Sequence, residues 1–216
     1  MYIMSEVLVW RIPLIPPPQK NNWELRSVTA FFISFHRLYK VSSAAIMPFD
    51  LITGKFIPEK SNIWRDCVDG YYDWTKEHIA EGAPLNEADH CGDPPLLLAA
   101  GNGHLACVKL LVNEGADLEQ RGMMKETPLS RAAHNGHFHT VKYLIEEGAE
   151  LDPLDLGDNT PMHWAAMRGH VEIVKYLLES GADKTLKNKQ ERLPIDKCQA
   201  CWSNSWRYVR ELLADD

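Results

Sequence analysis

Apolar and polar positions along this chain follow a pattern that occurs three times between Pro95 and Ala182. The three segments read PLLLAAGNGHLACVKLLVNEGA, PLSRAAHNGHFHTVKYLIEEGA and PMHWAAMRGHVEIVKYLLESGA. Each has an opening Pro, paired alanines, a Gly-His pair, a second apolar run and a closing Gly-Ala. The opening prolines, Pro95, Pro128 and Pro161, are 33 residues apart. A fixed period of this length indicates stacked structural repeats.

Each segment predicts two short helices. Pro suits the first helical position because its φ is preset and it has no N–H to leave unpaired. The Gly before each His can take the positive φ that ends a helix. Apolar residues then recur at helical spacing, as in Val141, Leu144 and Ile145. A polar stretch of about ten residues leads to the next Pro.

The pattern resembles the ankyrin repeat, whose T-P-L-H-x-A-A, G-H, V-x-x-L-L and G-A-D landmarks all have counterparts here. Thr160–Ala166 is the nearest copy of the first landmark. The resemblance implies an all-α solenoid of stacked helix-turn-helix units, whose connecting segments project as β-hairpin fingers. The stretches MPFDLITGKF and WRDCVDGYYDW are also similar to small stand-alone ankyrin proteins of plants.

The 33-residue register extends the prediction to five units, at about 59–91, 92–124, 125–157, 158–190 and 191–216. The first is degenerate, with Asn62 at the proline position and helices expected at 61–69 and 72–81. In the last, Trp202 replaces Gly and a two-residue insertion lengthens the turn. End units face solvent on one side and are expected to be atypical. Residues 47–58 are expected to pack on the aromatic-rich first unit.

Residues 1–46 show no repeat landmarks and have a local charge of +3, whereas the remainder has −10. Three interpretations stay open: a targeting presequence, a disordered tail, or a non-native extension before a start at Met47. A secretory signal fits poorly, because the apolar patch begins only near Val28 and no small-residue cleavage site follows it.

The overall charge of −7 argues against nucleic acid or an anionic membrane as the main partner. Five cysteines without a framework spacing fit a reducing compartment. No apolar run reaches the roughly 18 residues of a membrane span. A cytoplasmic monomer is therefore expected; a nuclear location is also compatible, and an organellar one if residues 1–46 are a presequence.

Histidine and cysteine are the candidates for chemistry. His104, His137 and His170 recur at the period, which favours a structural role, and in ankyrin repeats the residue matching His163 braces adjacent fingers. Cys198 and Cys201 form a C-x-x-C pair, but a second ligand pair for zinc is missing. In register, Cys198 matches Ala132 and Ala165, and Cys67 matches Ala100, so core packing is favoured over redox or metal binding. No catalytic motif is present, and no enzyme activity, metal or cofactor is expected.

Ankyrin partners usually meet the finger tips and the exposed positions of the first helix. Register places the tips at 90–91, 123–124, 156–157 and 189–190. Apolar residues on adjacent tips suggest an interface, and Met adapts well to binding surfaces. The basic residues near the C-terminal end could pair with acids on a partner. The candidate partner-binding residues are His90, Asn102, Met123, Met124, His134, Asn135, Leu156, Asn159, Met167, Arg168, Lys189 and Arg192.

The favoured function is that of a non-enzymatic adaptor, or protein–protein interaction module, for another protein. One alternative is an ankyrin-type chaperone or assembly factor for one client, which would use the same face. Another is a thiol-based redox accessory protein acting through Cys198 and Cys201.

Overall fold

The computed structural model describes residues 62–198 and 205–214, all within the unit Lys60–Asp216. The two N-terminal segments discussed above, Cys201 and most of the predicted insertion lie outside these residues. The helices come in consecutive pairs: α2 (Ile63–Asp69) and α3 (Tyr72–Ala80), α4 (Pro95–Gly101) and α5 (Leu105–Asn113), α6 (Pro128–Asn135) and α7 (Phe138–Glu146), and α8 (Pro161–Arg168) and α9 (Val171–Glu179). A 3₁₀ helix, η1 (Pro194–Lys197), and α10 (Ser205–Ala214) follow.

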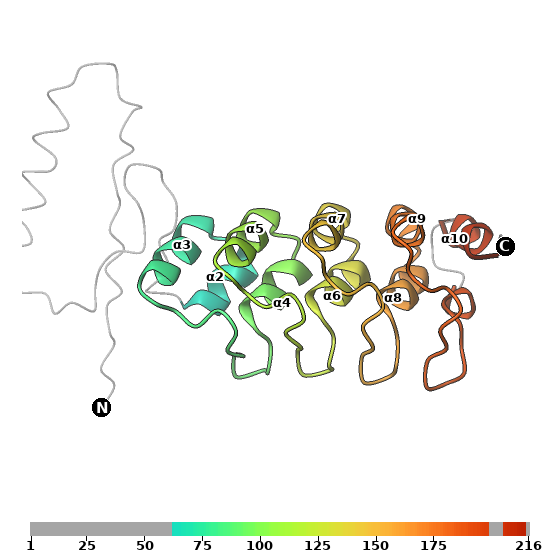
Figure 1. The fold of residues 1–216 in the computed structure, drawn as a ribbon, viewed down its shortest axis with the longest axis horizontal. Helices are drawn as coiled ribbons and strands as arrows, with labels where there is room; N and C mark the ends of the chain where they lie inside the picture. Colours follow the sequence, from blue (N-terminus) through green and yellow to red (C-terminus); the bar gives the residue numbers. More distant parts are fainter. Residues whose placement is uncertain (1–61, 199–204, 215–216) are drawn as a thin grey trace, which may run out of the picture. The chain divides into compact units, whose positions relative to one another are not determined.

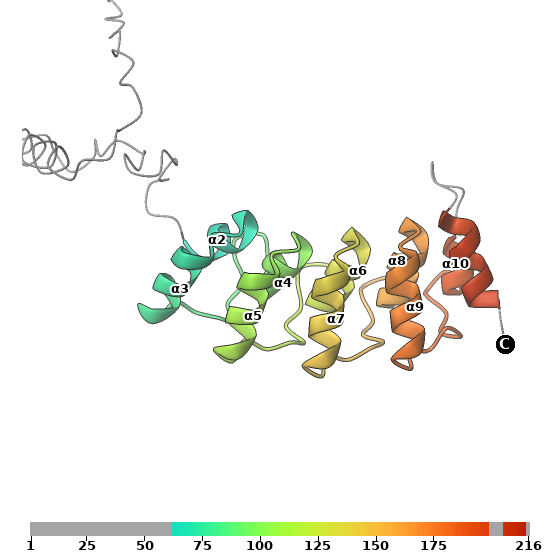
Figure 2. The ribbon, with the colours of Figure 1, turned by 90° about the horizontal axis from the view of Figure 1, so that it is seen from above.

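The pairs stack in two rows (Figure 1). The first helices, α2, α4, α6, α8 and then η1, contact one another in that order, and α3, α5, α7 and α9 form the second row. The loops that join successive pairs hang as a series of fingers below the first helices in Figure 1. Viewed from above, neighbouring pairs run nearly parallel (Figure 2). The predicted helical repeat solenoid is confirmed within the described residues.

The helix ends follow from the sequence landmarks. Thr127 and Thr160 cap α6 and α8 by accepting a hydrogen bond from the backbone N–H three residues ahead. Each of these helices begins with Pro and ends at a Gly with positive φ, Gly136 and Gly169. The first unit differs by one position from expectation: Asn62 is the N-cap of α2, and its side chain accepts from Arg65 N. An Asn side chain can satisfy that orphan N–H, which Pro cannot.

The periodic histidines join each pair to the one before it. Nε2 of His104, His137 and His170 lies 2.9, 2.9 and 3.1 Å from the carbonyl oxygens of Val68, Gly101 and His134, each 36 residues earlier. A Cβ built on Gly70 would lie 2.4 Å from the His104 ring, and Gly103 and Gly136 meet the next histidines at 2.4 and 2.5 Å. The Gly-His pair is therefore an interlock between units, and its structural role is confirmed.

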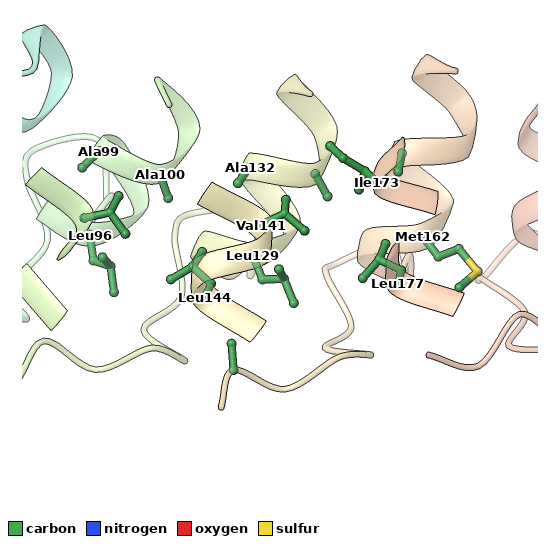
Figure 3. Close-up of a cluster of buried hydrophobic side chains, with 14 of the residues drawn as sticks. Leu96, Ala99, Ala100, Leu129, Ala132, Val141, Leu144, Met162, Ile173 and Leu177 are labelled. Atoms are coloured by element: carbon green, nitrogen blue, oxygen red, sulfur yellow. The ribbon is translucent and has the colours of Figure 1, made fainter. Parts of the chain in front are cut away.

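The core lies between the two rows and runs along the stack (Figure 3). The paired alanines Ala99/Ala100, Ala132/Ala133 and Ala165/Ala166 are all fully buried, which lets neighbouring helices approach closely. Cys67 is buried at the matching position of α2, as predicted. Larger side chains from both rows fill the remaining space, including Leu96, Leu129, Leu144, Met162, Ile173 and Leu177.

The last unit corrects the sequence expectation of a full helix pair. Its first helix is the short η1, which ends at Cys198 in an extended conformation. Cys198 is half-buried rather than a buried replacement for alanine. Among the described helices, α4, α6 and α8 each contact a first helix on both sides, whereas η1 has α8 on one side and α10 on the other. The helix stops there because Cys198, with ψ of 94°, lies outside the helical region of backbone conformation.

Candidate functional site at the fingers and first helices

Four fingers share one backbone turn. We define finger 1 as residues 89–93, finger 2 as 122–126, finger 3 as 155–159 and finger 4 as 188–192. In each, the first N–H donates to the carbonyl of the last residue at 2.9–3.2 Å, and the fourth N–H donates back to the first carbonyl. The second and third residues are the tip, and they are the pairs that the register predicts. The turns are hairpin-like, but no strand occurs among the described residues, so the expected β-hairpins are reduced to their turns.

The fourth position of every finger has a left-handed backbone. Gly92 has φ of 86° there, and Lys125, Asp158 and Glu191 have φ of 58°, 57° and 55°. Positive φ is uncommon for residues other than Gly, with Asn and Asp better tolerated than most. Three non-glycine residues in this conformation at one spacing show that the turn is imposed by the surrounding finger.

Adjacent fingers are also joined laterally. Leu156 N donates to Met124 O at 2.9 Å, and Lys189 N donates to Gly157 O at 3.0 Å. Arg121 extends its Nη1 to the carbonyl of Leu154, at 2.6 Å. Fingers 2, 3 and 4 are therefore held as a row, and their tips present a surface that is largely fixed in advance.

Finger 3 is organised by a buried carboxylate. Asp155 is 8% exposed, and its Oδ1 accepts hydrogen bonds from the backbone N–H groups of Gly157 and Asn159 at 2.7 and 2.8 Å. Its Oδ2 accepts from Trp164 Nε1 at 2.9 Å. Asp155 therefore fixes both the tip of finger 3 and the indole of α8 beside it.

Asn159 corrects one predicted site residue. It is 7% exposed, its Nδ2 donates to Asp155, and its Oδ1 accepts from Asn188 Nδ2 at 2.8 Å. Because Asn188 belongs to finger 4, Asn159 joins two fingers internally. It does not lie on the exposed surface, and sequence register alone did not reveal this inward orientation.

Finger 2 is organised by a cation instead. Arg131 of α6 donates through Nη2 to Glu126 Oε1 and to Asp93 Oδ2, the latter at 3.3 Å. The stem of Arg131 packs on Gly101, where a Cβ would meet it at 2.7 Å. The other oxygen of Glu126, Oε2, is buried and has no hydrogen-bond partner. Finger 2 thus contains a less fully satisfied network than finger 3.

His134 and Arg168 lie between α6 and α8. Burial, followed by the nearby cations Arg168 and Arg131, lowers the pKa of His134. The neutral ring can therefore accept at Nε2 from Arg168 Nε and Nη2, at 3.1 and 3.0 Å. The same ring stands edge-on to Trp164, with centroids 4.8 Å apart. These contacts hold the exposed Arg168 guanidinium beside the aromatic ring.

A pocket of about 240 Å³ opens among these groups. Met124 and Glu126 come from finger 2, Arg131 and His134 from α6, and Asp155 and Trp164 from finger 3 and α8. The sequence predicted two of these residues as site residues, Met124 and His134. Trp164 was missed, although it stands within the Thr-Pro-Met-His-Trp motif; its burial depends on contacts with finger 3.

Exposed apolar side chains collect on fingers 2 and 3. Met123 and Met124 are 67% and 58% exposed, and Leu156 is 44% exposed. Leu154, which precedes finger 3, is 42% exposed and was also missed. In the sequence, Leu154 and Leu156 alternate with the acidic Asp155, and this alternation could have indicated that both leucines point to the same side. We call these four residues the apolar tip patch; among the predicted apolar residues, Met167 is instead half-buried on α8.

The remaining predicted residues flank this patch. His90 and Lys189 are exposed at the tips of fingers 1 and 4, and Arg192 is exposed at the end of finger 4. On the first helices, Asn102 donates to Leu98 O and Asn135 donates to Gly101 O of the preceding unit, at 2.9 and 2.6 Å. Both asparagines stay exposed, so each combines a structural bond with a surface position.

The other candidates for chemistry have structural explanations. Asp89, His90 and Cys91 bring three possible metal ligands within 4.8 Å. However, Asp89 Oδ1 accepts from Cys91 N and Asp93 N, the same turn-fixing role that Asp155 and Asn188 play in fingers 3 and 4. Burial raises the pKa of Cys67, with a further contribution from Cys107, and burial also raises the pKa of Cys107. Both thiols are thus poor sources of reactive thiolate.

His163 shows how the T-P-L-H landmark works in this chain. The side chain is 1% exposed, and its Nδ1 lies 3.1 Å from Thr160 N and 2.9 Å from Thr160 Oγ1. Nε2 lies 3.0 Å from the carbonyl of Arg192, at the end of finger 4. The expected bracing of adjacent fingers is confirmed.

Comparison with known families agrees with this architecture. A family model described as ankyrin repeats (3 copies) matches residues 65–152 and 116–188. These matches together cover more than half of the chain, which belongs to the ankyrin-repeat family. Ankyrin repeats are generally protein–protein interaction modules, and fold alone does not specify a partner.

No curated protein matches the chain. Among the described residues, no helix is long and apolar enough to cross a membrane.

Proposed function

We propose that this chain is an adaptor that binds another protein through the apolar tip patch and the adjoining faces of α6 and α8. The observation that supports this proposal best is that Met123, Met124 and Leu156 on two adjacent fingers, and Leu154 just before the second of them, are all exposed. Contiguous exposed apolar surface in a folded protein often marks an interaction site. The lateral hydrogen bonds between fingers favour binding, because a fixed surface loses little conformational entropy on association.

The apolar tip patch is the better candidate when compared with other exposed apolar residues. Val68, Tyr71, Tyr72 and Tyr208 are also at least 40% exposed, on the first unit and on α10. The three tyrosines carry hydroxyl groups that remain hydrated at a free surface. The four residues of the tip patch carry no polar group that could serve in this way, and one of them, Met124, lines the pocket between fingers 2 and 3.

A quadruple substitution tests the proposal: Met123→Ser, Met124→Ser, Leu154→Ser and Leu156→Ser in the full chain. Partners captured by affinity purification and identified by mass spectrometry should be lost or strongly reduced. The matched control replaces Tyr72 and Tyr208 with Ser and should keep every partner. Circular dichroism and thermal unfolding verify that both variants are folded. Retention of all partners by the folded quadruple variant would show that binding occurs elsewhere.

Adaptor and single-client chaperone differ in the lifetime of the complex. A chaperone releases its client once the client is assembled, whereas an adaptor remains in the finished complex. Pulse-chase capture of the partner measures this lifetime directly. Persistence of the complex through the chase supports the adaptor, and loss of the complex as the partner matures supports the chaperone.

A further inference from the structure

The pocket between fingers 2 and 3 has the size of a side-chain socket. Its volume is about 240 Å³, below the roughly 300–1,000 Å³ of typical small-molecule sites. It lies beside Met123 and Met124, which are 67% and 58% exposed. A partner that covers the tip patch would therefore have this socket beneath it, and filling such a socket is how binding hot spots usually form.

The inner chemistry of the socket favours an apolar occupant. Asp155 already accepts from two backbone N–H groups and from Trp164 Nε1. Glu126 is 8% exposed and paired with Arg131, and its second oxygen is buried. The wall that remains accessible is formed chiefly by carbon surfaces such as those of Met124 and Trp164. A charged head group placed against these carbon surfaces would lose hydration.

The surroundings of the socket are cationic although the whole chain has a charge of −7. Exposed basic residues occur on fingers 2 and 4, just before these fingers and at the end of α8, while the acids of fingers 2 to 4, apart from the buried Glu126 and Asp155, are Asp158 and Glu191. Each of these acids already lies near a lysine: Asp158 Oδ1 is 3.8 Å from Lys189 Nζ, and Glu191 Oε2 is 3.4 Å from Lys187 Nζ. The basic residues are Arg121, Lys125, Arg168, Lys187, Lys189 and Arg192.

We infer that the partner is a protein segment that inserts one large apolar side chain into the Met124–Trp164 socket and carries acidic residues beside it. The inference rests on the proposed function and specifies the chemistry of its partner. Arg168 is the principal cation in this scheme, because His134 holds it at the edge of the socket. Electrostatic complementarity of this kind raises association rates and selects among partners.

Adjacent methionines provide a matched pair of variants. Met123 and Met124 are neighbours on the same tip, but only Met124 lines the socket. A random 12-residue peptide library displayed on phage is panned against the full chain. Selected peptides are then labelled with fluorescein, and their affinities are measured by anisotropy. Enriched peptides should share one large apolar residue flanked by Asp or Glu.

Loss of the socket should weaken peptide binding by about tenfold or more in Met124→Glu, compared with less than about threefold in Met123→Glu. Arg168→Glu should weaken it by about fivefold, and the loss should shrink at high salt. Lys175→Glu makes the same charge change on α9, in the other row of helices, and should leave the affinity unchanged.

Other outcomes overturn the inference. If panning enriches no acidic peptide with an apolar residue, or if both methionine variants lose equal affinity, the socket is not the anchor site. The adaptor proposal then still stands, provided that the quadruple variant loses its natural partner. Self-association of the wild-type chain in sedimentation, abolished by Met124→Glu, would identify a second copy as the occupant. Binding of an RNA oligonucleotide sensitive to Arg168→Glu alone would identify a nucleic-acid surface.

Discussion

Finger 2 is held at its base by a cation that serves two acids, whereas finger 3 is held by a carboxylate that serves several neutral donors. In finger 2, Arg131 pairs with Glu126 and Asp93 and leaves one buried carboxylate oxygen without a partner. In finger 3, both oxygens of Asp155 accept hydrogen bonds from within the finger or from Trp164. The backbone turns are nonetheless the same.

The difference teaches that the repeat specifies the shape of a finger more strictly than the chemistry that holds it. The socket lies where the two networks meet, so its walls depend on both. Each network also has one residue on which the others depend, Arg131 in one and Asp155 in the other. Replacing Asp155 or Arg131 should therefore change the free energy of unfolding most, and changes in backbone strain or in charge nearby should change it less.

Replacing Asp155 with Ala should have the largest effect. It leaves the N–H groups of Gly157 and Asn159 and the indole N–H of Trp164 without their acceptor, at a cost of about 3 kcal/mol in the free energy of unfolding. Urea denaturation followed by Trp fluorescence measures it. Glu77→Ala removes an exposed carboxylate from α3 and is the control; it should change stability by less than about 0.5 kcal/mol.

Replacing Arg131 with Met should cost about 2 kcal/mol. Met preserves packing on Gly101 but leaves Glu126 and Asp93 without their cation. Because the Arg131 side chain is 33% exposed, this loss should shrink in 0.5 M NaCl, unlike that of Asp155→Ala. Lys142→Met breaks only a surface pair with Glu146 and controls for the charge change. Equal salt dependence of Asp155→Ala and Arg131→Met would contradict the contrast between the fingers.

Glycine at the left-handed position should relieve strain unequally in the two fingers. Lys125→Gly should raise the free energy of unfolding by about 0.5 kcal/mol, because Lys tolerates positive φ poorly. Asp158→Gly should gain less, since Asp is among the residues that adopt this conformation more readily. Gly92→Ala, at the same position of finger 1, should be destabilising. Thermal unfolding of the three variants side by side tests this order.

The smallest effect concerns the segments just before fingers 2 and 3. There, Glu119 and Asp152 accept hydrogen bonds from the backbone N–H groups of Glu150 and Asp183. Burial raises the pKa of both carboxyl groups. The folded chain therefore binds protons more readily than the unfolded chain, and these groups favour folding increasingly as the pH falls through their raised pKa values.

Asn86 fills the matching position before finger 1 and accepts from Asp117 N at 2.9 Å. Asp152→Asn should therefore retain the hydrogen bond and change stability at pH 7 by less than about 0.5 kcal/mol. It should also remove the contribution of Asp152 to the pH dependence in the acidic range above the ordinary Asp pKa of 3.8. Urea titrations at several pH values show whether the slope is lower in the variant; an unchanged slope would contradict the prediction.

Much of this architecture was predictable from the sequence because it repeats. The helix pairs, the finger tips at the predicted positions and the Gly-His interlocks all depend on contacts that recur every 33 residues. The last unit was predicted less well. Its landmarks indicated a helix pair, but the first helix is the short η1, which ends where Cys198 takes an extended conformation.

The candidate site was predicted only in part. Met123, Met124 and Leu156 stood out as apolar residues at tip positions, and all three are exposed. The inward orientation of Asn159 and the role of Trp164 depend on which side chains of adjacent fingers meet. Those contacts join residues 9 to 29 positions apart, and the repeat pattern does not encode their chemistry.

The sequence by itself determined the family, the repeat boundaries and the residues that face the core. It did so because helix starts, helix ends and close helix packing each require particular residue types at fixed spacings. The tertiary structure alone decided which polar side chains hold the fingers and where a socket opens beside Met124. Such features arise from pairs of side chains on different units, whose orientations are fixed only when the units are stacked.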